Sequence, residues 1–407
     1  MENEVNWNKL LDCALGIAAR FLAYGAEISR VEDTVIQICK SYGADSVDVF
    51  AIPSKVEATI EIGDEYYTTK IRRIYDSEIN LGKIEELNQI SRDICTNLPN
   101  VSDIYEIIKE FDKPKKNKLF YLKYIAVFIG CFSFAVMYGG TIRDGISAGV
   151  IALLMSITSL FINKFAKYKL FNTLVLSVLG GFLSVLLYYI HLGEHISYIM
   201  IGAIMLLIPG KEFGIAFREL LMRDIISGAI RMFQAITIAL VIVIGFSIPI
   251  AIFNYDMDFY KFHNDYITVV FATLGCSAFA LIFNSKLKRL PFIAVGSFIV
   301  ITTYLILRNY DNSILVSTFV AQIVGALYSE IVARIIKSPT IITLITTNLS
   351  LVPGGLLYYT VYALYNNKVG AKAYFTDVLY SSIGIGAGIL FVSVFANAIN
   401  RYKNRNN

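Results

Sequence analysis

The chain has 407 residues, of which 56% are hydrophobic and only 17% are charged, and its mean hydropathy is +0.59. Soluble domains carry about 25% charged residues, so the composition excludes a wholly soluble protein and indicates that hydrocarbon surrounds much of the chain. The net charge of +4 is unevenly placed: residues 1–112 carry 11 basic and 21 acidic side chains (11 − 21 = −10), and the remainder is basic. This basicity lies in short loops between apolar runs, so it does not indicate a nucleic-acid partner.

The few cysteines and histidines limit the chemistry that the chain can support. The five cysteines form no CxxC pair or metal-ligand spacing, and three histidines are too few for a His-rich metal site. We therefore expect no metal and no cofactor. The first ten residues, MENEVNWNKL, are acidic and lack an apolar core, so we expect no cleaved signal peptide and a cytoplasmic N-terminal domain.

The pattern of residues 1–112 predicts a small α+β domain. Apolar positions recur at helical spacing from Leu10 to Ile38 with a break near Tyr24-Gly25, and Ser29-Arg30-Val31-Glu32 resembles a capping box at a second helix start. Residues 45–75 alternate β-branched and aromatic residues around a Gly63-Asp64 turn, which predicts an antiparallel meander. Two amphipathic helices follow, at Lys83–Cys95 and Ser102–Phe111.

The start of the second predicted helix holds the most polar cluster of this domain, with Glu27, Arg30, Glu32 and Asp33. These side chains could contact an ion or substrate at the inner mouth of a pore. Alternatively, they form a helix start with charge pairs such as Glu27 with Arg30, and the physics of helix surfaces favours this second interpretation. The domain has no His, no nucleophile elbow and no Gly-rich phosphate loop, so an enzyme is not predicted.

Ten apolar runs follow a basic linker at residues 113–118. They lie near 119–139, 143–162, 170–190, 196–209, 225–252, 266–285, 290–307, 313–335, 340–353 and 376–399. With the N-terminus inside, the loops carry Lys and Arg in a ratio of 19 inside to 5 outside, with Arg231 unassigned. We therefore expect a polytopic helical protein of the cell (inner or plasma) membrane, with ten helices, both termini cytoplasmic and a tail at 400–407.

The ten runs contain an internal repeat. The segments GCFSFA from Gly130 and GCSAFA from Gly275 are separated by 275 − 130 = 145 positions, and Pro209-Gly210 and Pro353-Gly354 by 353 − 209 = 144. Each unit holds five runs, so the second copy, 266–399, must cross the membrane in the opposite sense to the first, 119–252. Inverted five-plus-five repeats are a recurrent plan of secondary transporters, whose substrate binds at the repeat interface.

The two Pro-Gly breaks are candidate substrate sites. A helix that stops at Pro-Gly frees backbone groups that only protein or cavity water can satisfy. On the inverted plan we expect Pro209-Gly210 at the cytoplasmic end of one half and Pro353-Gly354 at the outer end of the other. The alternative is that each Pro-Gly pair simply ends a helix at the membrane interface.

Polar side chains inside the apolar runs are the remaining candidates. Glu330 stands in the eighth run, where a carboxylate costs about 2.5–3.5 kcal/mol and is usually functional, although it could instead pair with Arg334. Gln322, Asn348 and Arg231 are secondary candidates. Asn348 lies in a Ser/Thr-rich helix, which suits hydrogen bonding to a zwitterion or carboxylate, but a lone Asn is as often a helix–helix contact.

Several motifs resemble the threonine/serine exporter family. The stretch Tyr24–Thr34 with Val49-Phe50 and Pro53 resembles the signature of the family's first part, and Leu81-Gly82 with Asn88, Ser91 and Arg92 also fits it. In the second half, the matching residues are Phe271–Gly275, Pro339 and Leu351-Val352-Pro353-Gly354. The resemblance covers nearly the whole chain. It implies export of threonine and serine coupled to the proton-motive force; similar split pairs of chains are associated with succinate export.

These observations predict a secondary active transporter that exports threonine, serine or a similar small polar acid by alternating access. The expected partners are this small-molecule substrate, protons and the lipid bilayer. A dicarboxylate exporter and a channel are the alternative functions. The chain could also form a homo-oligomer. An intramembrane enzyme is disfavoured, because the runs lack the His or paired carboxylates that such chemistry needs.

Overall fold

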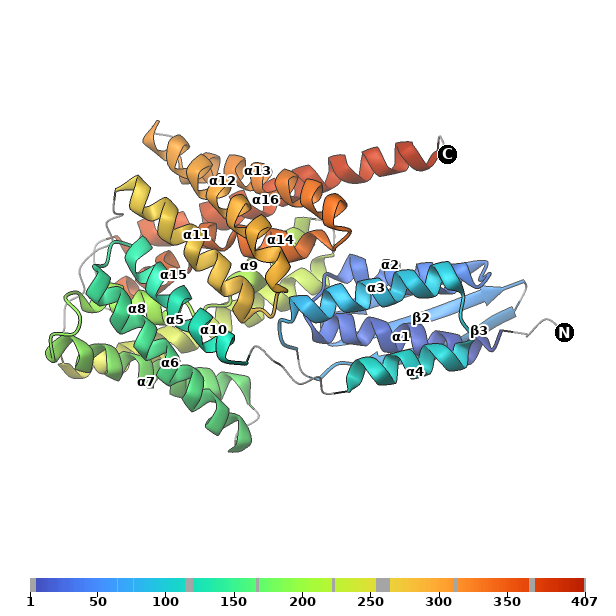
Figure 1. Ribbon diagram of the computed structural model, residues 1–407, viewed down its shortest axis with the longest axis horizontal. Helices are drawn as coiled ribbons and strands as arrows, with labels where there is room; N and C mark the ends of the chain where they lie inside the picture. Colours follow the sequence, from blue (N-terminus) through green and yellow to red (C-terminus); the bar gives the residue numbers. More distant parts are fainter. Residues whose placement is uncertain are drawn as a thin grey trace. The chain divides into compact units, whose positions relative to one another are not determined.

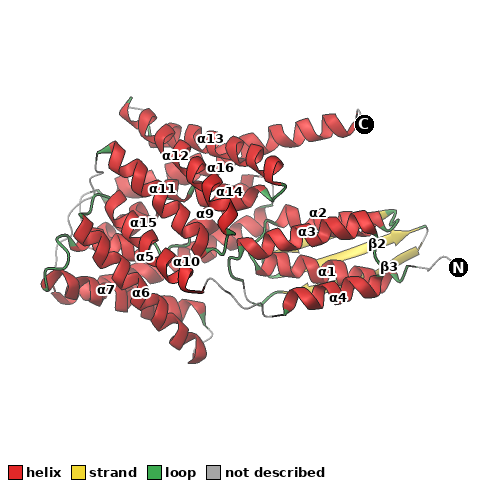
Figure 2. Ribbon diagram, in the orientation of Figure 1, coloured by secondary structure: helices red, strands yellow, loops and turns green. Residues whose placement is uncertain are grey.

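The computed structural model describes residues 5–405 apart from 64, 76, 114–119, 166–167, 222–223, 254–263, 311–312 and 366–369. The chain divides into two compact units. Unit 1 contains residues 1–118 together with two short segments from later in the chain, Phe283–Lys286 and Lys337–Ile342. Unit 2 contains the remaining residues (Figures 1 and 2).

Unit 1 is an α+β fold, as the sequence predicts. Its elements are α1 (Trp7–Ala23), α2 (Ile28–Ser41), β1 (Ser46–Ile52), β2 (Lys55–Ile62), β3 (Glu65–Arg73), α3 (Leu81–Asn97) and α4 (Val101–Asp112). The sheet order β1-β2-β3, antiparallel throughout, confirms the predicted meander. Along β2 the buried residues Val56, Ala58 and Ile60 alternate with more exposed polar ones, so one face of the sheet is covered. Helix α1 contacts β2 and β3, and α2 contacts β1.

The predicted capping box at Ser29 and Glu32 is wrong. The residue that caps α2 is Glu27, which makes no side-chain capping bond. The Glu32 carboxylate instead accepts a hydrogen bond from the backbone N–H of Ala51 in β1, at 3.0 Å. Packing of α2 on the sheet therefore uses the acidic side chain that the local pattern assigns to the helix end.

Unit 2 is helical. In chain order its helices are α5 (Phe120–Met137), α6 (Ile142–Phe165), α7 (Lys169–Tyr189), α8 (Ile196–Ile204), α9 (Gly210–Leu221), α10 (Ile225–Phe253), α11 (Asp265–Ile282), η1 (Leu287–Arg289), α12 (Leu290–Asn309), α13 (Ile314–Ile336), α14 (Thr340–Thr347), η2 (Leu349–Leu351), α15 (Gly354–Tyr365) and α16 (Ala371–Arg405). Every one of the ten predicted apolar runs overlaps a helix. The first residues of α14 belong to unit 1 by compactness.

Among the described residues, seven helices are long and apolar enough to cross a membrane, and α14 with α15 forms an eighth candidate that bends by 41°. The described part of α5 is apolar but shorter, Tyr121–Met137. Helix α8 has nine residues. At 1.5 Å per residue it covers about 14 Å, half of the roughly 30 Å hydrocarbon core. The fourth predicted run is therefore not one unbroken helix, because the chain turns at Pro209 and continues as α9.

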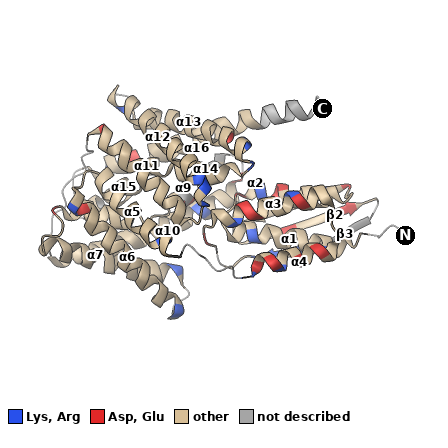
Figure 3. Ribbon diagram, in the orientation of Figure 1, with Lys and Arg blue, Asp and Glu red and all other residues tan. Residues whose placement is uncertain are grey.

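The surface of unit 2 is suited to lipid. Large apolar side chains such as Phe233, Ile244, Val394 and Phe395 are more than half exposed on its helices. Charged residues crowd α1–α4 and are sparse along the helices of unit 2, as Figure 3 shows. Broad exposed apolar faces on long helices are what a bilayer covers.

Candidate functional site

The two Pro-Gly breaks lie against each other inside unit 2. A Cβ atom placed on Gly210 would lie 2.8 Å from Cγ1 of Val352, and one placed on Gly354 would lie 2.7 Å from Cδ1 of Ile208. Both distances are below van der Waals contact, so a side chain at either position would have to displace its neighbour, and glycine allows the segments to approach. The contact is reciprocal, because Ile208 precedes one Pro-Gly and Val352 precedes the other.

This arrangement corrects the prediction that the two breaks occupy opposite ends of the membrane domain. The physical reason is the length of the helices before them. Helix α8 has nine residues and α14 has eight, so each covers only about half of the hydrocarbon thickness. Neither helix is long enough to cross the hydrocarbon alone, and the two breaks that follow them meet.

Two helix N-termini lie at this crossing. Helix α9 begins at Gly210 and α15 at Gly354, and each has 12 residues. The first amides of a helix have no partner within the helix, and the helix dipole places partial positive charge at that end. Such ends bind carboxylates and phosphates, so the crossing is suited to an anionic group.

Tyrosines surround the crossing. Tyr138 lies beside α15, since a Cβ on Gly355 would be 3.2 Å from its ring. Tyr358 and Tyr359 are 1% exposed, and the Tyr358 hydroxyl lies 3.6 Å from Sδ of Met200 in α8. The sequence analysis did not select these residues, although the run GLLYYTVYALY after the second Pro-Gly carries three of its four tyrosines at helical spacing.

Two of the predicted polar residues of the second half have unsatisfied side chains. Gln322 of α13 is fully buried, and within the described structure neither its Oε1 nor its Nε2 has a hydrogen-bond partner. Asn348 follows α14; its Nδ2 donates to the carbonyl of Leu344 at 2.8 Å, while its Oδ1 has no partner among the described residues. Oδ1 of Asn348 stands against Gly325, one turn from Gln322 on α13.

Polar side chains at equivalent positions of the internal repeat form one row on α7, the α7 stripe, and one row on α13, the α13 stripe. The side chains of the α7 stripe have hydrogen-bond partners. In the internal repeat, Thr173, Ser177 and Ser184 of α7 correspond to Thr318, Gln322 and Ser329 of α13 (for Gln322, 322 − 177 = 145). Each of the three α7 hydroxyls donates to a carbonyl one turn earlier, at 2.7–2.9 Å. On α13, by contrast, Gln322 and the buried Ser329 hydroxyl lack partners among the described residues. Because an unpaired buried polar group costs about 1–3 kcal/mol, the α13 stripe is the one that a ligand could satisfy.

Arg231 lies in an ion pair that the sequence analysis did not foresee. Its Nε is 3.1 and 3.0 Å from the two carboxylate oxygens of Glu219, and both side chains are less than one-tenth exposed. The pair joins α9 to α10. Glu219 could not be selected from the sequence, because it stands in an amphipathic segment and its partner belongs to the next helix. Glu330 is half-buried near the end of α13.

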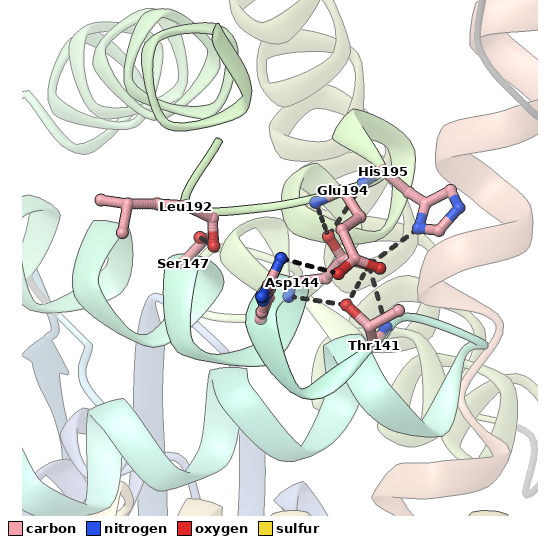
Figure 4. A network of polar contacts seen from close by, with 7 residues as sticks. Thr141, Asp144, Ser147, Leu192, Glu194 and His195 are labelled. Carbon is pink, nitrogen blue, oxygen red and sulfur yellow. Dashed lines mark hydrogen bonds and ion pairs between the residues drawn. The ribbon is translucent and has the colours of Figure 1, made fainter. Parts of the chain in front are cut away.

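A second polar network fixes the connection before α8 (Figure 4). The Asp144 carboxylate is fully buried and accepts hydrogen bonds from the backbone N–H groups of Thr141, Glu194 and His195 at 2.7–2.9 Å. The Thr141 hydroxyl and Nδ1 of His195 lie 3.1 and 3.0 Å from its Oδ2. Thr141 and Asp144 form a capping box on α6. The network holds the start of α8, and the sequence analysis missed it.

The four candidates from the first domain lie in unit 1. Glu27 and Glu32 have the structural positions already described. Arg30 is half-buried, and this partial burial lowers the pKa of its guanidinium, an effect to which nearby Arg92 adds. Burial also raises the pKa of Asp33. The other eight predicted residues, Pro209, Gly210, Arg231, Gln322, Glu330, Asn348, Pro353 and Gly354, lie in unit 2.

Comparison with known proteins identifies family models that match the chain. Two family models match the chain, both described as threonine/serine exporter (ThrE), one over residues 12–253 and the other over 268–395. Similar proteins include pheromone-regulated membrane protein 10 of Pichia sorbitophila, 22% identical over 77% of this chain and 33% of that protein. The Kluyveromyces lactis protein of the same name is 21% identical over 94% of this chain and 43% of its own length. The chain thus spans less than half the length of these relatives. No solved structure matches it.

Proposed function

The chain belongs to the threonine/serine exporter family, and on that premise we propose that it is a secondary transporter that exports threonine, serine or a related small polar acid. It is a multi-pass membrane protein. The proposed export is driven by the proton-motive force and proceeds by alternating access. The observation that carries the proposal is the contact between the two Pro-Gly breaks, through Gly210 with Val352 and Gly354 with Ile208.

Broken helices that meet inside a helical bundle are the usual form of a transporter site, with the N-termini of half-helices facing the carboxylate of the substrate. In our proposal first-turn amides of α9 and α15 bind the substrate carboxylate, apart from the Gly354 N–H, which donates to the carbonyl of Val352 at 2.7 Å. Two N-termini offer room for two anionic groups, which is the observation that keeps a dicarboxylate as the alternative substrate.

The open stripe of α13 completes the proposed site. Gln322 and Asn348 offer amide donors and acceptors without a formal charge, so they suit the hydroxyl and ammonium groups of a small amino acid. The satisfied stripe of α7 in the first half supports this assignment, because the two stripes are related by sequence and differ in whether their polar atoms have partners. We assign the substrate to the second-half side of the crossing.

The proposed architecture is an inverted repeat of five spans. The offset from α5 to α11 is the same at both ends of the helix (265 − 120 = 145 and 282 − 137 = 145), and so is the offset from α9 to α15 (354 − 210 = 144 and 365 − 221 = 144). If α8 with α9 and α14 with α15 each form one broken span, then residues 119–252 and 266–399 hold five crossings each. Unit 1, with the linker 113–118, then lies in the cytoplasm, and so does the tail 400–407. The segments Phe283–Lys286 and Lys337–Ile342 support this orientation, because both belong to unit 1 and both are predicted to be inside.

The proposal is tested in inside-out vesicles from cells that make the full chain. We expect accumulation of labelled threonine several-fold above vesicles without the chain, lost when a protonophore collapses the pH gradient. Unlabelled serine should compete. If succinate competes and serine does not, the dicarboxylate alternative replaces threonine and serine. Equal accumulation of all three solutes with and without the chain would contradict transport.

A further inference from the structure

Helix α3 begins against a connection that lies about 200 residues later in the chain. The segment Phe283–Lys286 joins α11 to η1 in sequence and belongs to the same compact unit as α3. The N–H of Leu81 donates to the carbonyl of Phe283 at 2.9 Å, and the N–H of Gly82 donates to the carbonyl of Asn284 at 3.0 Å. The next two amides of α3 are bonded to its own cap, Asn80. The first four amides of α3 are therefore all satisfied, two of them by this connection.

Gly82 and Asn284 have residue types that suit the backbone geometry of this contact. A Cβ atom on Gly82 would lie 2.7 Å from the carbonyl oxygen of Asn284, so no other residue fits without displacing the connection. Asn284 itself has a positive φ of 57°, a left-handed conformation that Asn adopts more readily than most residues. Each side of the contact thus carries a residue type that the geometry needs.

An ion pair stands beside these hydrogen bonds. Nζ of Lys286 is 3.0 Å from Oε1 of Glu85, whose side chain is 10% exposed. Burial of the carboxylate makes this pair worth more than a surface pair. One turn further along the same face of α3, Asn88 is 1% exposed. Its Oδ1 and the buried hydroxyls of Ser285 and Ser338 have no hydrogen-bond partner within the described residues.

We propose that the N-terminal turn of α3 is a docking surface for the Phe283–Lys286 connection, and that this contact is a latch that must open during transport. The contact includes backbone amides, an ion pair and buried polar atoms that are unsatisfied when docked, so opening lets water satisfy them. Because the connection links α11 to α12, holding it fixes the neighbouring ends of two second-half helices. The latch role rests on the proposed transport function, whereas the docking surface does not.

The docking surface is tested first by hydrogen exchange of the full chain in detergent. Lys286→Glu should make the Leu81 and Gly82 amides exchange at least tenfold faster, and the swap Glu85→Lys with Lys286→Glu should restore their protection. Lys288→Glu is the matched control, since Lys288 is exposed and lies just beyond the docked segment, and it should leave both amides protected. Unchanged exchange in the Lys286→Glu variant would overturn the docking surface.

The latch is tested with the pair Glu85→Cys and Lys286→Cys in a Cys95→Ser background, where the remaining cysteines are buried. Oxidation should join the two positions, as mass spectrometry reports, stop labelled-threonine accumulation in vesicles, and be reversed by reductant. A cross-link that forms without slowing transport would make the contact a permanent tie and overturn the latch. Failure to cross-link would overturn docking itself. If the unoxidised chain moves none of the solutes, the proposed function fails and the latch falls with it, while exchange and cross-linking still decide docking.

Discussion

Phe134 of α5 and Phe279 of α11 pack edge to face, with ring centroids 5.4 Å apart and an interplanar angle of 81°. Each ring also covers a glycine of the other helix. A Cβ on Gly130 would lie 2.9 Å from the Phe279 ring, and one on Gly275 would lie 3.0 Å from the Phe134 ring. The two glycines are equivalent positions of the internal repeat, and so are the two phenylalanines. A reciprocal contact of this kind is the signature of a two-fold axis, and it supports the proposed relation between the halves.

The first prediction concerns these glycines. Gly130→Ala and Gly275→Ala should each lower the stability of the detergent-solubilised chain by about 1–3 kcal/mol, because the added methyl group overpacks a tight helix crossing. Thermal unfolding measures the effect. Gly214→Ala is the control, since its Cβ would meet only Ile385 at 3.9 Å. Similar melting temperatures for all three variants would contradict the close crossing.

The second prediction concerns the buried pair between Glu219 and Arg231. Removing one partner takes this ion pair away from the other buried charge, so Glu219→Gln and Arg231→Met should each destabilise the chain by about 3–5 kcal/mol. The double variant Glu219→Leu with Arg231→Met should lose less than either single variant, because it leaves no charge behind. Thermal unfolding of the three variants is the measurement, and additive losses would show that the two side chains do not act as a pair.

Much of this architecture follows from local pattern. Long apolar runs predict most helices of unit 2, since burial in lipid demands them, and alternation predicts the three strands. The runs do not predict α9 and α15, and the fourth and ninth runs extend past the ends of α8 and α14. The same reasoning fails where a partner lies far along the chain. Glu32 fits a capping box locally, but the structure uses it to bind Ala51 of β1.

The candidate site shows the same division. Pro209-Gly210 and Pro353-Gly354 stand out in the sequence because Pro-Gly ends helices, and Gln322 and Asn348 because polar groups are rare in apolar runs. Their neighbours do not stand out. Nothing local indicates that Gly210 contacts Val352, that Asp144 binds the connection before α8, or that Tyr358 reaches Met200. These contacts depend on how the helices pack, which no single run encodes.

The third prediction is a pH dependence of unit 1. The hydrogen bonds from Arg20, of which Nε to Oδ1 is 2.9 Å, lower the pKa of Asp112. A carboxyl whose pKa is lower in the folded state contributes stability that is present above its unfolded pKa of about 3.9 and is lost as the pH falls through the folded value. The protection of the α1 and α4 amides, which is the intrinsic exchange rate relative to the observed rate at the same pH, should fall below pH 4 in the wild type, and Asp112→Asn should weaken this acid dependence. Glu106→Gln, at an exposed ion pair, should keep it.

The fourth prediction concerns Glu330 of α13. If this half-buried carboxylate carries a proton of the transport cycle, Glu330→Gln should reduce uphill transport of labelled threonine at least tenfold while exchange between equal concentrations continues. The pH dependence of the residual transport should flatten. Wild-type accumulation with an unchanged pH profile would assign Glu330 a structural role.

The fifth prediction separates function from stability at Gln322. Leucine at this position removes two buried polar atoms that have no partner in the described structure, so Gln322→Leu should raise the stability of the chain by about 1–3 kcal/mol. The same change should reduce threonine transport at least tenfold, because the substrate loses those hydrogen bonds. Opposite signs in the two measurements are expected only of a group kept for a ligand.

The matched control for Gln322 is its equivalent in the first half, Ser177, whose hydroxyl already donates to the Thr173 carbonyl at 2.7 Å. Ser177→Ala should leave transport within about twofold and lower stability by no more than about 1 kcal/mol, the net value of one hydrogen bond. If Gln322→Leu loses stability and transport together, the side chain supports packing and the α13 stripe is not the substrate side of the crossing. If instead Ser177→Ala is the variant that loses transport, the substrate faces the first half.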